Sequence, residues 1–252
     1  MTGVADAEPA LAPPTLQLLG AFRARTGRAL LVFPSSVQRG LAYLALHGAT
    51  SRKQVAAALW PDQEATRAAS DLRTLLWRLQ HVSPDFVAVD GSVLELHDRV
   101  RVDVDVVTAW ALESISPGAV SLVERVVTPR GAGRDLLPGW DEPWLDLHRT
   151  RLQMLQAQAY EAVTSRLLAA GRVAEALPFA LHVIEQDPLR ESAQQLMIEI
   201  HLRQGNVAQA LAQYERYRVL LERELGIAPG LRVTTLIGQY SARPAPRRTA
   251  PH

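Results

Sequence analysis

The side chains best suited to chemistry lie between residues 64 and 81, where a helical period of 3.6 separates two faces. One face is apolar and suits a core: Ala68, Leu72, Leu75, Leu76 and Leu79. The other face carries cations, hydroxyls and a tryptophan: Thr66, Ser70, Arg73, Thr74, Trp77 and His81, flanked by Arg67, Asp71 and Arg78. Guanidinium and hydroxyl groups hydrogen-bond phosphates and base edges, so this face could bind a nucleic acid. The pattern is also consistent with the solvated face of an ordinary amphipathic helix.

Trp77 is the unusual member of this polar face, because an exposed tryptophan often marks a contact surface. The favoured interpretation is that Trp77 packs under an N-terminal sheet or against a helical domain. Trp140 and Trp144, near the Pro138-Gly139 turn, are expected to be core residues rather than ligand-stacking ones.

The surrounding elements make this helix the third of three. Two strands are expected at 15–25 and 28–33, followed by a helix that Ser35 or Ser36 caps and a second helix that Ser51 caps. After the third helix come a hairpin, with strands 86–89 and 93–96 around Asp90-Gly91, and a strand with Val100, Val102 and Val104. This order predicts an α+β winged helix-turn-helix, whose third helix enters the DNA major groove.

The second half of the chain has an almost continuous helical pattern and an internal repeat. Residues 171–180 match residues 205–214 at five positions, with the 34-residue offset of tetratricopeptide repeats. Stacked helical pairs of this kind usually bind proteins. We therefore expect a disordered N-terminus at 1–14, a winged-helix domain at 15–104, an all-α tetratricopeptide-like domain at 105–240 and a disordered tail at 241–252.

Charge is nearly balanced over the whole chain, with 27 basic and 26 acidic residues. Residues 16–104 hold eleven basic and eight acidic side chains, or +3, while residues 105–252 hold sixteen of each, or 0. The balance excludes an indiscriminate polycationic binder and leaves room for a local basic surface. The sequence shows no secretory signal and no membrane-spanning run, so we expect a cytoplasmic protein with no membrane partner.

Signals for catalysis or metal binding are weak. The chain has no cysteine, no histidine pair spaced i, i+4 and no nucleophile-elbow motif. Asp103 and Asp105 are expected to share a strand face as solvated or capping groups, and Gly131 and Gly133 to lie in a plain loop. We expect neither an enzyme nor a cofactor or metal site.

Several segments together resemble one known family. They are LQLLGAFRARTGRALLVFP, RGLAYLAL, QVAAALWPD, LRTLLWRLQ, VDVDVVTAW, LLPGWDEPWLDLHRTRL and LLERELGIAPG, in this order between about residues 15 and 240. Their sequences and their order are similar to those of the SARP/AfsR-type transcriptional regulators, in which an OmpR-like winged helix precedes a bacterial transcriptional activator domain.

The resemblance implies a sequence-specific activator that binds double-stranded promoter DNA, typically at direct repeats near the −35 element. It also implies recruitment of RNA polymerase through sigma and other subunits, typically for secondary-metabolite gene clusters such as those of antibiotic biosynthesis. Direct repeats would place protomers head-to-tail on the DNA. Gln80 stands where such helices often carry a further arginine, so this end of the helix has less positive charge than the family pattern. About 5–8 phosphate contacts per protomer are expected.

The resemblance also implies roles for individual side chains. We expect base-reading or groove-facing roles for Arg67, Ser70, Arg73 and Thr74, with Trp77 on the same face. Backbone contacts are expected from Arg52, Lys53, Arg78 and His81, and contacts beside the wing from Arg99 and Arg101. Two alternatives remain: a protein-interaction scaffold that uses the helical repeats, and a ligand-responsive repressor with an effector pocket between helices.

Overall fold

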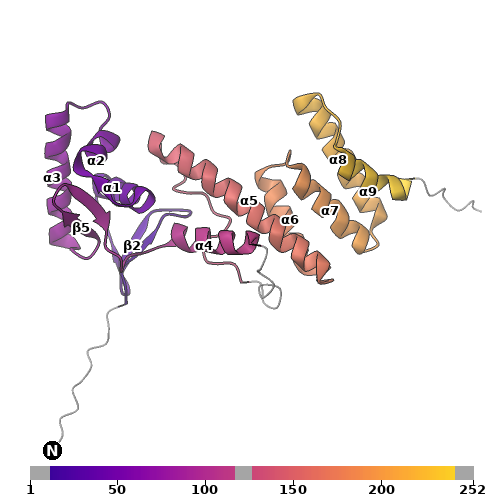
Figure 1. The fold of residues 1–252 in the computed structure, drawn as a ribbon, viewed down its shortest axis with the longest axis horizontal. Helices are drawn as coiled ribbons and strands as arrows, with labels where there is room; N and C mark the ends of the chain where they lie inside the picture. Colours follow the sequence, from indigo (N-terminus) through magenta and orange to yellow (C-terminus); the bar gives the residue numbers. More distant parts are fainter. Residues whose placement is uncertain (1–11, 117–126, 242–252) are drawn as a thin grey trace, which may run out of the picture. The chain divides into compact units, whose positions relative to one another are not determined.

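The computed structural model describes residues 12–116 and 127–241, which form two compact units (Figure 1). The first unit holds the chain up to Ala109 together with Pro129–Gln153, and the second holds Trp110–Thr128 together with the chain from Met154 onward. Most of the two ends that were expected to be disordered, residues 1–11 and 242–252, lie outside the described residues. The domain boundary expected near residue 105 stays a prediction.

A four-stranded sheet opens the first unit. Its strand order is β3-β2-β1-β7, with bounds β1 (Thr15–Gln17), β2 (Arg23–Thr26), β3 (Ala29–Leu31) and β7 (Arg101–Val102). The single strand expected over 15–25 is wrong, because the chain reverses near Gly20, whose φ of 82° lies in the left-handed region. The strand expected through Val104 is also wrong: β7 ends at Val102 and pairs with β1 in parallel, and Asp103 begins a helix.

Three helices and a β-hairpin complete the winged helix-turn-helix that the sequence predicts. They are α1 (Ser35–His47), α2 (Arg52–Leu59), α3 (Ala65–Val82) and the hairpin strands β5 (Val87–Asp90) and β6 (Val93–Leu96), with β4 (Thr50–Ser51) joining the hairpin sheet in the order β4-β6-β5.

The helix caps and the hairpin turn agree only in part with those that the sequence predicts. Ser51 caps α2 in a capping box with Gln54, as expected. Neither Ser35 nor Ser36 caps α1, because Pro34 occupies the N-cap position and Ser35 is already helical. The hairpin loop is Gly91-Ser92 rather than Asp90-Gly91, since Asp90 pairs with Val93.

The core of the first unit lies between the four-stranded sheet and the three helices. All five apolar residues expected on the inner face of α3 are buried: Ala68, Leu72, Leu75, Leu76 and Leu79. They share one cluster with Leu16, Ala24 and Val102, which face inward from the sheet. Burying each leucine contributes about 1.5–3 kcal/mol relative to exposure, so the core fixes the rotation of α3 about its axis.

Asp103 joins the far end of the sheet to the start of α4 (Asp103–Ile115). Its two carboxylate oxygens accept hydrogen bonds from the backbone N–H groups of Leu18 and Leu19, at 2.8 and 3.0 Å. Both leucines are fully buried, so no water could replace this partner. Burial raises the pKa of Asp103, while the backbone N–H donors act in the opposite direction. The expectation that Asp103 and Asp105 share a strand face is therefore wrong, since both lie in the first turn of a helix.

A segment from the second half of the sequence packs on the same sheet edge. Leu136 forms an isolated β-bridge with Leu19, and the N–H of Leu137 donates to the carbonyl of Leu18 at 2.9 Å. Arg149 donates to the carbonyls of Leu136, Leu137 and Trp140, which fixes the turn in place. Residues 129–153 are thus part of the first unit through hydrogen bonds as well as packing.

The second unit is helical in its described residues and includes parts of α4 and α5. Its bounds are α5 (Asp146–Ala169, preceded by the 3-10 helix η2, Pro143–Leu145), α6 (Val173–Gln186), α7 (Glu191–Arg203), α8 (Val207–Leu225) and α9 (Leu231–Ser241). Helices α6 to α9 pack as consecutive neighbours along the chain.

The sequence repeat coincides with equivalent positions in this helical array. Gly171 and Gly205 both adopt a left-handed φ, of 73° and 76°, just before α6 and α8. Ala176 and Ala210 are both fully buried, so each lets a neighbouring helix approach closely. The tetratricopeptide-like arrangement predicted from the 34-residue period agrees with these positions.

We expect Asp103→Asn to destabilise the first unit by about 1–3 kcal/mol, because an amide oxygen cannot satisfy both buried N–H groups. Urea unfolding followed by tryptophan fluorescence measures the change. Asp98→Asn is the matched control, since Asp98 is exposed, and it should leave the transition unchanged. Equal transitions for the two variants would contradict the anchoring role of Asp103.

Candidate nucleic-acid interface

The outer face of α3 is open to solvent along its whole length. Of the residues expected on this face and its flanks, Asp71 is half-buried and the others are exposed: Thr66, Arg67, Ser70, Arg73, Thr74, Trp77, Arg78 and His81. Within the described part of the chain, no ion pair engages Arg67, Arg73 or Arg78. Three guanidinium groups are therefore available to an external anion, on a helix whose opposite face is locked into the core.

Trp77 contributes to this face rather than to a core. Its side chain is 59% exposed, so the favoured expectation that it packs under a sheet is wrong. Packing against the helical domain stays a prediction. Its ring lies against that of His81, one helical turn later, with centroids 4.2 Å apart. The His81 ring also forms a hydrogen bond with the carbonyl of Trp77 at 2.8 Å. The two tilted rings form an exposed aromatic pair on the same face as the arginines.

Helix α2 brings two more cations next to α3. Arg52 and Lys53 line a cleft of about 610 Å³ between the two helices, together with Thr66 and Arg73. The start of α2 is tied to the hairpin, because the N–H of Arg52 donates to the carbonyl of Ser92 at 2.8 Å. The structure thus gathers residues from α2 and α3, which the sequence grouped only by resemblance, at one cleft.

The two arginines expected beside the wing lie in different surroundings. Arg99 forms an exposed ion pair with Asp85, at 3.0 Å, so its charge is already partly matched. Arg101 lies in β7 and lines a second cleft on the outer face of the four-stranded sheet. It is not brought together with the α3 residues at the α2–α3 cleft.

That second cleft collects basic residues that the sequence analysis did not single out. They are Arg23, Arg25, Arg130 and Arg134. The alternation of Arg23, Ala24 and Arg25 was a readable signal of a basic outer strand face. The contribution of the loop at 130–134 was not readable, because it depends on contacts more than 100 residues apart in sequence.

The remaining candidates for chemistry prove structural. Trp140 stacks on Phe22 with ring centroids 6.0 Å apart, and Trp144 packs edge-on against Tyr43 at 5.3 Å, which confirms the expected packing roles. Over residues 12–116 and 127–241, no three histidine, aspartate or glutamate side chains lie close enough to hold a metal ion. No helix in the same ranges is sufficiently long and apolar to cross a membrane.

Comparison with known proteins gives one family and one fold. A family described as the bacterial transcriptional activator domain matches residues 132–239. The regulatory proteins AfsR of Streptomyces griseus and Streptomyces coelicolor are each 29% identical, over 225 and 224 residues. These matches cover 84% of this chain but only 23% and 22% of the relatives, so the chain spans less than a quarter of their length.

A solved structure shares the fold over nearly the whole chain. It is that of Mycobacterium tuberculosis EmbR in complex with a low-affinity phosphopeptide, with a TM-score of 0.73 and 17% sequence identity. The match covers 93% of this chain and 66% of EmbR. The arrangement of a mixed α/β region followed by an all-helical region is therefore that of a known fold.

We expect Trp77→Ala to change the free energy of unfolding by less than about 0.5 kcal/mol, because the ring is exposed. Leu76→Ala, at the neighbouring position, should cost about 2–5 kcal/mol, because Leu76 is 6% exposed within the core. Urea unfolding of both variants measures the difference. A large loss for Trp77→Ala would show that the ring is buried after all.

Proposed function

Because the chain belongs to the SARP/AfsR-type transcriptional regulators, we propose that it binds promoter DNA through α3 and activates transcription. The observation that carries the proposal is the row of exposed guanidinium groups on α3, held by a buried leucine face on the same helix. A helix fixed in this way can enter the major groove without reorganising the core.

Within this proposal, Arg67, Ser70, Arg73 and Thr74 face the bases. Arginine can bind guanine through two hydrogen bonds, and serine or threonine can bind several bases. The hydroxyl of Thr74 already donates to the carbonyl of Ser70 at 3.2 Å, so its free lone pairs favour a role as acceptor. Trp77 covers the adjoining sugar and phosphate surface together with its partner His81.

Phosphate contacts in this proposal come from both sides of the recognition helix. Arg52 and Lys53 approach one strand of the duplex from α2, and Arg78 and His81 approach the other end of the α3 footprint. Arg99, at the base of the hairpin, would exchange its exposed partner Asp85 for a phosphate. Exposed ion pairs of this kind contribute about 0–1 kcal/mol, so the exchange costs little. About 5–8 phosphate contacts per protomer would follow.

The helical unit supplies the second half of the proposed activity. Helices α6 to α9 form consecutive antiparallel neighbours, an arrangement that commonly binds proteins. We propose that they contact RNA polymerase or a second protomer, with protomers head-to-tail on direct repeats near the −35 element. A secondary-metabolite gene cluster is the proposed target, and the cytoplasm, at the nucleoid, is the proposed location.

The central test uses Arg67→Ala and Arg73→Ala. A preferred duplex is first selected from a randomised pool with the wild-type chain, and its affinity is then measured by fluorescence anisotropy. Loss of a base-reading arginine should weaken binding to the selected duplex by about 1–3 kcal/mol and relax the sequence preference. Arg28→Ala is the matched control, because Arg28 is an exposed arginine in the β2–β3 turn, away from α3. Wild-type affinity for both α3 variants would refute the recognition role.

Arg78→Ala tests the phosphate role separately. We expect weaker binding to all duplexes alike and a salt slope reduced by about 1, because one phosphate contact and its released counterion are lost. A change in sequence preference instead would move Arg78 to the base-reading group.

In vitro transcription with purified polymerase tests the activator role on a template that carries the selected duplex upstream. Stimulated transcription supports the proposal. Repression would favour the ligand-responsive repressor, and the absence of any selected duplex would favour a protein-interaction scaffold.

A further inference from the structure

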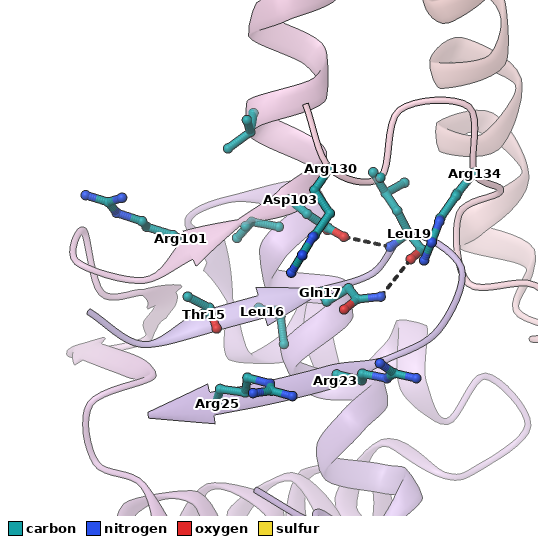
Figure 2. A pocket seen from close by; sticks show the side chains of 13 residues that line it. Thr15, Leu16, Gln17, Leu19, Arg23, Arg25, Arg101, Asp103, Arg130 and Arg134 are labelled. Atoms are coloured by element: carbon teal, nitrogen blue, oxygen red, sulfur yellow. Dashed lines mark hydrogen bonds between the residues drawn. The ribbon is translucent and has the colours of Figure 1, made fainter. Parts of the chain in front are cut away.

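The outer face of the four-stranded sheet carries a second cleft, of about 630 Å³, that the DNA-binding proposal does not use (Figure 2). Side chains alternate along each strand, so Leu16, Ala24 and Val102 face the core while their neighbours face outward. In the sheet register, Thr15 lies between Arg25 of β2 and Arg101 of β7, and Gln17 lies beside Arg23. Strands β2 and β7, on either side of β1, therefore deliver three arginines to one face.

A loop from residues 129–137 forms the opposite wall of the cleft. Arg130 and Arg134 descend from it toward the sheet in Figure 2. The loop is held in place by a hydrogen bond from the Gly20 N–H to the carbonyl of Asp135, at 2.8 Å. Gly131 approaches Leu19 so closely that an added Cβ would lie 3.0 Å from a Leu19 methyl group. The wall is a closely packed part of the unit, so residues of the sheet and of the loop line one cleft, although Arg101 points away from Arg130 and Arg134 in Figure 2.

The cleft holds an unbalanced positive charge. Among the described residues, Asp103 is the one carboxylate that lines it, and both oxygens of Asp103 accept backbone hydrogen bonds from Leu18 and Leu19. Within the described part of the chain, none of the five arginines forms an ion pair. Five guanidinium groups against one carboxylate leave a lining charge of +4. Like charges gathered in this way repel one another, and a bound anion would relieve that repulsion.

We propose that this cleft binds a small molecule with two or more phosphate groups. Each phosphate monoester carries about −1.5 to −2 near neutral pH, so two of them match the lining charge. Guanidinium groups bind phosphate oxygens through paired hydrogen bonds, which arginine favours over lysine. The volume lies within the range of about 300–1,000 Å³ that small-molecule sites occupy.

The residues that line the cleft indicate which part of the ligand is recognised. Over residues 12–116 and 127–241 it contains no aromatic ring on which a base could stack, and its apolar members, such as Leu19 and Val106, are aliphatic. Recognition therefore rests on the phosphates rather than on an attached group. A pyrophosphate-bearing metabolite or a nucleoside polyphosphate shares this chemistry.

A duplex seated on α3 does not account for the cleft. Leu75 of α3 and Leu16 of β1 both point into the same core, one from each side. The arginine face of the sheet thus points away from α3, and the core separates the two surfaces. Contact between the cleft and DNA is the main competing outcome of the test.

The experiment is calorimetric titration of the full chain with inorganic pyrophosphate, tripolyphosphate and a nucleoside triphosphate. The wild type should bind pyrophosphate at one site per chain, and the double variant Arg25→Gln/Arg101→Gln should bind it at least about tenfold more weakly, because two charge-assisted contacts are lost. Arg28→Gln is the control, since it makes the same arginine-to-glutamine change once on the neighbouring turn, and it should bind as the wild type does. Arg130→Gln tests the loop wall independently of the sheet.

Equal affinity for the double variant and for Arg28→Gln would overturn the proposal, as would no binding of any of the three probes. Equal affinities for pyrophosphate and the nucleoside triphosphate place recognition on the phosphates, as expected. If the nucleoside triphosphate binds more than about tenfold more tightly than tripolyphosphate does, recognition by phosphates alone is overturned.

Binding measurements with the selected duplex distinguish this site from the proposed promoter contact. The double variant should keep wild-type affinity for the selected duplex, and Arg67→Ala/Arg73→Ala should keep wild-type affinity for pyrophosphate. If the duplex displaces pyrophosphate, or if the double variant loses duplex binding, the cleft is a DNA contact and the small-molecule proposal fails. Failure of α3 to bind DNA would leave the pyrophosphate result standing.

Discussion

A single carboxylate determines how the first unit is assembled. Asp103 accepts the N–H groups of Leu18 and Leu19 at the point where β7 ends and α4 begins. The carbonyl of Leu18 then accepts the N–H of Leu137, and the N–H of Gly20 donates to the carbonyl of Asp135, so a segment from much later in the chain pairs with Leu19. An unpaired N–H group in this buried place would cost about 1–3 kcal/mol, so the sheet, α4 and the later segment depend on one another. The same contact takes up both oxygens of the carboxylate in backbone hydrogen bonds, so they are directed at Leu18 and Leu19 rather than at the neighbouring arginines.

The same packing principle exposes the arginines on both surfaces of this unit, the outer face of α3 and the outer face of the sheet. In α3 the buried leucines fix the helix so that Arg67 and Arg73 project outward, and in the sheet Leu16 and Ala24 do the same for Arg23 and Arg25. The period is 3.6 in the helix and 2 in the strands, but the result is alike: a tightly packed inner face presents cations in fixed positions. Both surfaces therefore follow from the core and need no separate scaffold.

The sequence predicts the local features of this fold better than the distant ones. Helical periodicity identified α3 and its buried face, and Ser51 marked the start of α2, because both signals act within a few residues. The reversal at Gly20 was missed because the apolar spacing of residues 15–25 continues through it. Trp77 was misplaced because hydrophobicity alone argues for burial, whereas its angular position on α3 decides exposure. The arginine cleft was missed because register and loop contacts, rather than neighbours in sequence, bring residues 23, 101 and 130 together.

The segment Pro129–Gln153 has an evolutionary consequence. Each compact unit is built from two stretches of chain, so the polypeptide passes from one unit to the other three times. The activator-domain match begins at residue 132, inside the segment that completes the first unit. A single breakpoint before residue 132 would separate Leu18 and Leu19 from residues 136 and 137, the backbone that covers them. Neither half can therefore be exchanged between regulators without the other. We expect the two halves to be inherited as one module.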